Sequence, residues 1–219
     1  MFEFTFHPEL SAIPPAERSA LAETFDRLAE TIWRKDDRFW REFPDLWSDM
    51  MGSVLARADG ELVGFFLYQR LVVDDKSIFY IHGINVHPRL QSSGLQAQLW
   101  AKAVPYEVAR ARGGTIYLAA RTRNPLVLAI ASRICSKIVP GPDPENDDPA
   151  LRALALRVSE ALYPGVHVEQ PLMIIRDAYT NFSYLWPQHH RNREVDARIY
   201  GDKLGECDVY FMLGLLRVN

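Results

Sequence analysis

Cysteine is scarce in this chain, which has only two among 219 residues, Cys135 and Cys207. Neither stands in a Cys-x-x-Cys pair or at the spacing of a set of metal ligands, and two cysteines alone do not build a disulfide framework. The histidine pair His189-His190 has no third ligand at a suitable spacing. We therefore expect reduced thiols and no metal.

Long apolar runs and an excess of positive charge are also missing. No apolar run approaches the roughly 20 residues that span a bilayer, and the N-terminus lacks the basic and apolar regions of a signal peptide. Lysine and arginine number 25 against 28 acidic residues, which gives a net charge of −3. Without a basic field, binding to nucleic acid or to a membrane surface is not expected. The sequence predicts a cytoplasmic protein.

The chain does have enough apolar material for a core. Hydrophobic residues make up 48% of the sequence and charged residues 24%, which is typical of globular proteins. We find no internal repeat and no clear linker. The prediction is therefore one domain over residues 1–219, with an elaborated C-terminal part over about 136–219.

The first half of the chain predicts a strand, two helices and a meander of three strands. Residues 1–7 alternate apolar and polar side chains. Apolar residues then recur at helical spacing from Ala16 to about Phe43, where Pro44 ends the run, and we interpret this as two helices with a bend. Strands are expected over 52–58, 62–73 and 77–86, with turns between them.

The second half predicts helices alternating with strands. Helices are expected over 94–111, over 125–134 and over 151–162, with Pro105 bending the first of them. Strands are expected over 115–120 and 208–216, and residues 166–175 are a further candidate strand. The proline-rich stretch 140–149 has the composition of a loop.

The segment that joins the third meander strand to the next helix is the clearest candidate site. Its sequence is Val86-His87-Pro88-Arg89-Leu90-Gln91-Ser92-Ser93-Gly94-Leu95-Gln96. Small residues let an anion approach the backbone closely. The first N–H groups of a helix have no partner within the helix, and its dipole favours negative charge there. The pattern therefore predicts a phosphate-binding loop.

This segment, together with the order of the predicted elements, resembles the GNAT superfamily of acyl-CoA-dependent N-acyltransferases. In that family a Val-x-Pro segment, here Val86-His87-Pro88, precedes a Gln/Arg-x-x-Gly-x-Gly/Ala loop, here 91–96, whose amides hold the pyrophosphate of coenzyme A. The resemblance is closest over about 52–135. It implies an α/β (α+β) fold with a mixed, mostly antiparallel sheet flanked by helices and splayed between its fourth and fifth strands.

The resemblance also implies a co-substrate, acetyl-CoA or another acyl-CoA, and residues that hold it. Ile84 and Val86 would offer backbone groups to the pantetheine arm, and Asn124 matches an asparagine that faces this arm in the family. The loop residues implied in pyrophosphate binding are Gln91, Ser92, Ser93, Gly94, Leu95 and Gln96. Gln96 is a departure, because the family usually has glycine or alanine there.

The candidate catalytic residues are His82 and Ser132. His82 shares strand parity with Ile84 and Val86, and histidine can serve as a general base. A purely structural histidine is the alternative. Many family members carry a tyrosine on the helix after the asparagine, which protonates the leaving thiolate, and here Ser132 stands in that region.

Residues expected to contact the acceptor lie in an aromatic region and at a strand end. In the family, the first two helices and their link line the acceptor site, which makes Trp33 and Trp40 candidates. Packing in the core is the other interpretation of both. Asn85, at the end of the third meander strand, either binds substrate or caps backbone groups.

We therefore expect an N-acyltransferase that moves an acetyl or other acyl group from acyl-CoA to the amine of a small molecule. One alternative is a catalytically inactive module that binds acyl-CoA or a protein partner. Another is a transferase of long acyl chains, which the aromatic region suggests. The long C-terminal part is compatible with an elaborated acceptor site or with a homodimer.

Overall fold

The computed structural model describes residues 1–35, 43–111, 114–180, 182–185 and 204–217. The chain divides into two compact units, one formed by Met1–Arg70 and Ile81–Arg112 and the other by Leu71–Tyr80 and Gly113–Asn219. Strands β4 (Glu61–Val73) and β5 (Lys76–Val86) contribute residues to both units.

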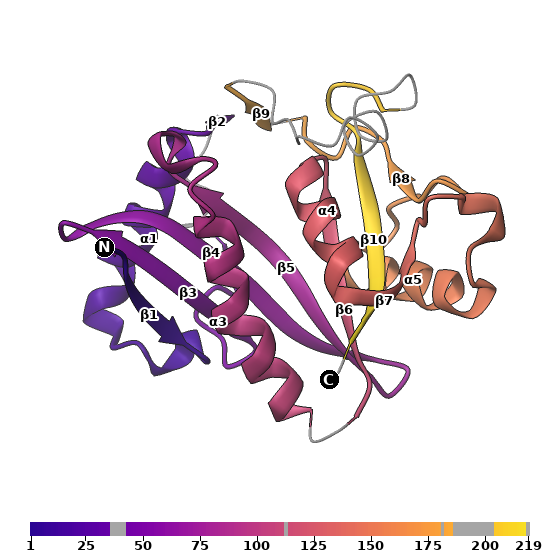
Figure 1. Cartoon of the computed structure of the whole chain (residues 1–219), viewed down its shortest axis with the longest axis horizontal. Helices are drawn as coiled ribbons and strands as arrows, with labels where there is room; N and C mark the ends of the chain where they lie inside the picture. Colours follow the sequence, from indigo (N-terminus) through magenta and orange to yellow (C-terminus); the bar gives the residue numbers. More distant parts are fainter. Residues whose placement is uncertain (36–42, 112–113, 181, 186–203, 218–219) are drawn as a thin grey trace. The chain divides into compact units, whose positions relative to one another are not determined.

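The first unit contains the predicted meander. Its strand order is β1 (Glu3–His7), β3 (Met51–Ala58), β4 and β5, which lie as neighbours in Figure 1. Strand β1 pairs antiparallel with β3, and β3 pairs antiparallel with β4 so that Val54 lies opposite Phe66. The turn between β3 and β4 places Gly60 at φ +80°, a left-handed conformation that glycine adopts without strain. The predicted strands are confirmed.

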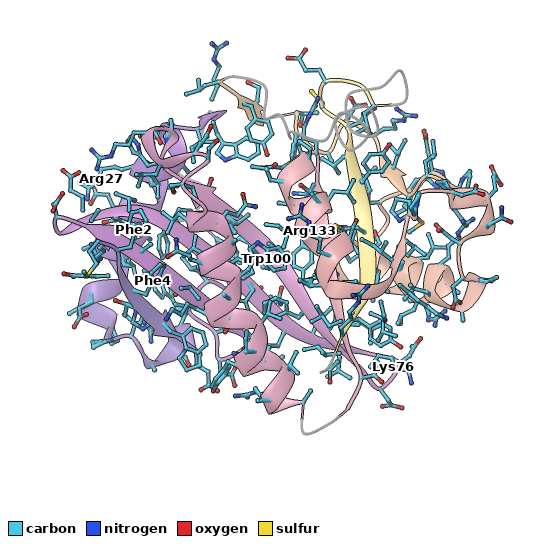
Figure 2. All side chains as sticks on the ribbon, in the orientation of Figure 1. Phe2, Phe4, Arg27, Lys76, Trp100 and Arg133 are labelled. Carbon is cyan, nitrogen blue, oxygen red and sulfur yellow. The ribbon has the colours of Figure 1, made fainter. Side chains whose placement is uncertain are left out.

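Two helices pack on this part of the sheet against two successive residues of β4. Phe65 packs in one buried cluster with Phe25 of α1 (Pro15–Glu30). The next residue, Phe66, stacks at 5.3 Å on Trp100 of α3 (Leu95–Arg110), labelled in Figure 2. Because successive residues of a strand point to opposite faces, α1 and α3 cover opposite faces of the first unit.

The predicted helical run that starts at Ala16 is wrong over residues 31–35. Helix α1 ends at Glu30, and β2 (Trp33–Lys35) follows. The hydroxyl of Thr31 donates to the carbonyl of Leu28 at 2.7 Å, and two β-branched residues followed by a tryptophan favour extended backbone over helix. The predicted second helix lies largely in 36–42, outside the described residues.

The second unit contains strands β5, β6 (Ile116–Thr122), β10 (Val209–Leu216) and β7 (Cys135–Val139) in that order, and β8 (Ile174–Ile175) also pairs with β10. Helix α5 (Pro149–Leu162) buries Leu154 and Val158 against Phe211 of β10. Helix α4 (Pro125–Ile134) contacts β6, β7 and β10. The remaining described elements are β9 (Phe182–Tyr184) and three short 3₁₀ helices, η1 (Leu10–Ala12), η2 (Pro88–Leu90) and η3 (Pro144–Asn146).

Two expectations for the second unit need correction. The candidate strand over 166–175 reduces to Ile174–Ile175, because Met173 adopts φ +57°, which interrupts an extended run. Strand β7 was not expected, because it begins at Cys135 directly after α4 without a turn residue. The predicted fold class, a mixed and mostly antiparallel sheet flanked by helices, is confirmed. Among the described residues, no helix is long and apolar enough to cross a membrane.

The contact between β10 and β7 leaves no room for a side chain at Gly214. A Cβ atom there would lie 2.5 Å from Sγ of Cys135 and 3.0 Å from its Cβ. We expect Gly214→Ala to lower the free energy of unfolding by about 1–3 kcal/mol through overpacking, as measured by urea denaturation. Adding Cys135→Ala should recover part of this loss, and a double variant no more stable than Gly214→Ala would contradict the account.

Candidate functional site

The loop between β5 and α3 is fixed at its start by hydrogen bonds within the first unit. The amide of His87 donates to the carbonyl of Val63 at 2.8 Å, which ties the end of β5 to β4. Nδ1 of His87 accepts from the amide of Arg89 at 3.3 Å and thereby caps η2. Burial, together with the neighbouring Arg89, lowers the pKa of His87. His87 is therefore neutral at pH 7 and serves as a capping acceptor.

The second half of this loop combines exposed small residues with left-handed backbone. Ser92 adopts φ +70° and Gly94 adopts φ +80°. Gly94 is the N-cap of α3 and supplies no side-chain oxygen, while the amide of Leu95 makes a long bond of 3.3 Å to Oγ of Ser93. The start of α3 therefore presents amides that no N-cap side chain covers, which is the geometry of an anion site.

Gln96, which departs from the family pattern, is less exposed than Ser92 and Ser93 of the same loop. Its Nε2 atom is buried and has no hydrogen-bond partner among the described residues. Ser92, Ser93 and Gly94 are exposed, whereas Gln96 is half-buried. The amide end of Gln96 therefore lies away from solvent, so a glutamine at this position does not cover the exposed part of the loop.

Strand β5 carries His82 close to a polar partner on β4. Nε2 of His82 lies 2.8 Å from Oε1 of Gln69, and the ring of Phe43 meets the imidazole edge-on at 4.9 Å. Because a carboxamide oxygen only accepts, this bond places the hydrogen on Nε2 and the lone pair on Nδ1. Gln69 was not expected as a site residue. Its signal in the sequence is slight: a polar residue directly after the apolar run that ends at Tyr68.

Two of the expected acceptor-binding residues lie together in the first unit. Nε1 of Trp33 donates to Oδ1 of Asn85 at 2.9 Å. Asn85 is only 5% exposed, so this bond satisfies an otherwise costly buried amide. Trp40 lies outside the described residues. The acceptor-binding role of all three stays a prediction.

The candidates in the second unit have local structural partners. Oδ1 of Asn124 accepts from the amide of Leu126 at 2.9 Å and caps α4. Oγ of Ser132 donates to the carbonyl of Leu128 at 2.9 Å on an exposed helix surface. Burial raises the pKa of the Cys135 thiol to about 12, which makes this cysteine a packing residue rather than a nucleophile. Roles of Asn124 and Ser132 toward acyl-CoA stay predictions.

In the described part of the chain, no three histidine, cysteine, aspartate or glutamate side chains gather as a metal site. The polar features of the first unit are instead an amide-lined loop and a hydrogen-bonded histidine. A helix start of this kind has the geometry of an anion site, and the adjoining strand carries a hydrogen-bonded histidine.

The sequence model of the acetyltransferase (GNAT) family matches residues 19–131 of this chain. This match spans the meander, the loop and α3. The chain belongs to the GNAT acetyltransferase family, whose members use acyl-CoA. No curated protein matches the sequence significantly.

Solved structures with a similar fold are distant in sequence. A ribosomal-protein-alanine N-acetyltransferase of Escherichia coli is 14% identical, with 100% of this chain and 96% of that chain covered and a TM-score of 0.49. A ribosomal-protein-alanine N-acetyltransferase of Brucella melitensis is 21% identical, with 55% of this chain and 79% of that chain covered and a TM-score of 0.37. An aminoglycoside N-acetyltransferase in complex with coenzyme A is 18% identical, with 61% of this chain and 86% of that chain covered and a TM-score of 0.44.

Proposed function

We propose that this protein transfers an acetyl or other acyl group from acyl-CoA to the amine of a small molecule. Family membership supports an acyl-CoA donor. The observation that carries the proposal is the left-handed, uncapped start of α3 at Gly94, directly after Val86-His87-Pro88. An amide-lined helix start of this kind suits the two negative charges of a pyrophosphate.

The residues around this loop fit coenzyme A by their chemistry. The uncapped backbone amides at the start of α3 would bind the pyrophosphate. The exposed Arg89, which pairs with Glu61 at 3.3 Å, is free to rearrange because surface ion pairs contribute little. The backbone of Ile84 and Val86, at the end of β5, would pair with the amides of the pantetheine arm. Such pairing aligns the thioester beside the strand that carries His82.

The transfer itself needs few groups from the protein. The acceptor nitrogen attacks the thioester carbonyl carbon, a C–N bond forms, and the C–S bond breaks to release coenzyme A. The amine loses one proton, for which Nδ1 of His82 is the proposed base, and the leaving thiolate gains one from solvent. A backbone amide near Val86 would polarise the carbonyl oxygen.

Gly94→Ala tests the proposed loop. A Cβ at Gly94 would meet no atom within 4 Å of it in the protein itself, so it would reach only into space that the proposal assigns to pyrophosphate. We expect coenzyme A to bind at least about tenfold more weakly, a change of about 1.4 kcal/mol, as measured by isothermal titration calorimetry.

Gly60→Ala is the matched control. Gly60 has the same φ of +80° and also has nothing within 4 Å of an added Cβ, so both variants introduce the same backbone strain. Coenzyme A should bind Gly60→Ala as it binds the wild type. Equal affinity of all three proteins would remove the loop from the proposal.

A further inference from the structure

A cavity in the first unit is lined by two arginines. Its walls come from the C-terminal half of α1, the turn between β3 and β4, and the residue that follows β5, and its volume is about 410 Å³. All of these segments belong to the same compact unit. We call this space the arginine cavity. Its polar lining residues are Thr24, Arg27, Thr31, Arg57, Glu61 and His87.

Each of the two guanidinium groups is held by a neutral oxygen. Nη2 of Arg27 donates to Oγ1 of Thr24 at 3.2 Å, and Nη1 of Arg57 donates to the carbonyl of Gly60 at 3.2 Å. Among the described residues, neither arginine pairs with a carboxylate. Because a guanidinium has five N–H donors, one neutral bond leaves most of them unused. Three other arginines of the same unit do form ion pairs: Arg70, Arg89 and Arg110.

The charges that line the cavity favour an anion. Glu61 is the single acidic residue among the described lining residues, and Arg89 already pairs with it at 3.3 Å. The charges of Arg27 and Arg57 are therefore not balanced by the lining. Arg57 is half-buried, which lowers the screening of its charge by solvent.

His87 adds a hydrogen-bond donor to the lining and connects the cavity with the loop at the start of α3. Its Nδ1 accepts from the amide of Arg89, so the ring hydrogen of the neutral imidazole lies on Nε2. His87 is also the first residue after β5, in the segment that ends at the uncapped Gly94. The cavity and the proposed pyrophosphate loop are therefore joined by one short stretch of chain within one unit.

We propose that the arginine cavity binds a phosphate monoester through Arg27 and Arg57. Such a group carries about −1.5 to −2 charges at pH 7, which two guanidinium groups can balance, whereas a carboxylate carries only one. Guanidinium groups also match the geometry of phosphate oxygens. Two sources supply this chemistry: the 3′-phosphate of coenzyme A, which rests on the proposed function, and a free phosphorylated small molecule.

Coenzyme A and 3′-dephospho-coenzyme A differ only in the phosphate monoester and provide the first comparison. Both are titrated calorimetrically into the full chain and into the double variant Arg27→Gln with Arg57→Gln. If the 3′-phosphate is the ligand, the wild type binds coenzyme A about tenfold more tightly than the dephospho form, and the double variant binds both equally. Gly94→Ala should weaken both by the same factor, because both contain the pyrophosphate.

Inorganic phosphate provides the second comparison. If the ligand is a free phosphorylated molecule, the wild type binds the two forms of coenzyme A equally, and inorganic phosphate binds the wild type at least about tenfold more tightly than the double variant. Glu61→Gln removes the acid from the lining. It should strengthen binding by about two- to fivefold for whichever probe distinguishes the wild type from the double variant.

The double variant Arg34→Gln with Arg110→Gln is the matched control. Both arginines are exposed residues of the first unit that do not line the cavity, so the control removes the same charge from the unit without changing the cavity. It should bind every probe as the wild type does. Arg27→Gln alone keeps the test open if the first double variant does not fold, because Arg27 is exposed, and it should lose about threefold.

Two results would overturn the inference and leave the proposed function intact: equal binding of all three probes by the wild type and the variant without Arg27 and Arg57, or an equal loss in the control. If neither form of coenzyme A binds the wild type, the proposed function fails. Inorganic phosphate then decides the inference alone: weaker binding by the variant supports the cavity, and unchanged or absent binding overturns it.

Discussion

Replacing Glu107 with alanine is expected to lower the free energy of unfolding by about 3–5 kcal/mol, the cost of leaving a buried charge without its partner. Glu107, on α3, is 3% exposed. It accepts from Nε of Arg70 at 2.8 Å and from the hydroxyl of Tyr68 at 2.9 Å. Burial, followed by the charge of Glu107, raises the pKa of Tyr68, which therefore stays neutral and would be left without an acceptor.

This loss is measured by guanidinium chloride denaturation at pH 7. The control is Arg110→Ala, one turn further along α3, which removes an exposed ion pair with Glu9 at 3.3 Å. Surface pairs contribute about 0–1 kcal/mol, so this variant should unfold close to the wild type. A Glu107→Ala variant that loses less than the control would show that the network does not hold α3 to the sheet.

Replacing His82 with alanine is expected to lower kcat for acyl transfer by about 100- to 10,000-fold, the usual contribution of a positioned general base. The affinity for coenzyme A should change little, because the proposed base acts on the acceptor. Stopped assays of thiol release at saturating acetyl-CoA measure the rate, and titration calorimetry measures the affinity.

Two further variants separate a base from a structural histidine. Gln69→Leu removes the bond of 2.8 Å that orients the imidazole, and kcat should fall less than in His82→Ala. His167→Ala, at an exposed position of the second unit, should leave kcat unchanged. A His82→Ala variant with wild-type kcat but lower thermal stability would assign His82 to packing against Phe43.

The parts of the fold that could be predicted are those with local signals. The meander follows from β-rich runs separated by Asp-Gly and Asp-Asp turns, and α4 from Asn124 followed by Pro125. The end of α1 could not be predicted from periodicity, because Ile32 and Trp33 continue an apolar stripe although the chain becomes extended. Strand β7 has no signal of its own, because its ladder is completed by β10, far along the chain.

In the candidate site, too, the features with a local sequence signal could be predicted and the long-range contacts could not. The loop at 91–96 is visible in the sequence because its small residues are contiguous and precede a helix. The partner of His82 is not visible there, because Gln69 reaches it only through the folded sheet. Long-range contacts of this kind leave no periodic trace.

The most direct test of the proposed acyl transfer is to incubate the purified full chain with acetyl-CoA and a panel of small amines, and to follow thiol release and the mass of the acceptor together. The proposal predicts release of one thiol for each N-acetylated acceptor, with both signals reduced in Gly94→Ala and His82→Ala. Binding of coenzyme A without any acetylated product would contradict the proposed transfer and would favour a module that only binds acyl-CoA.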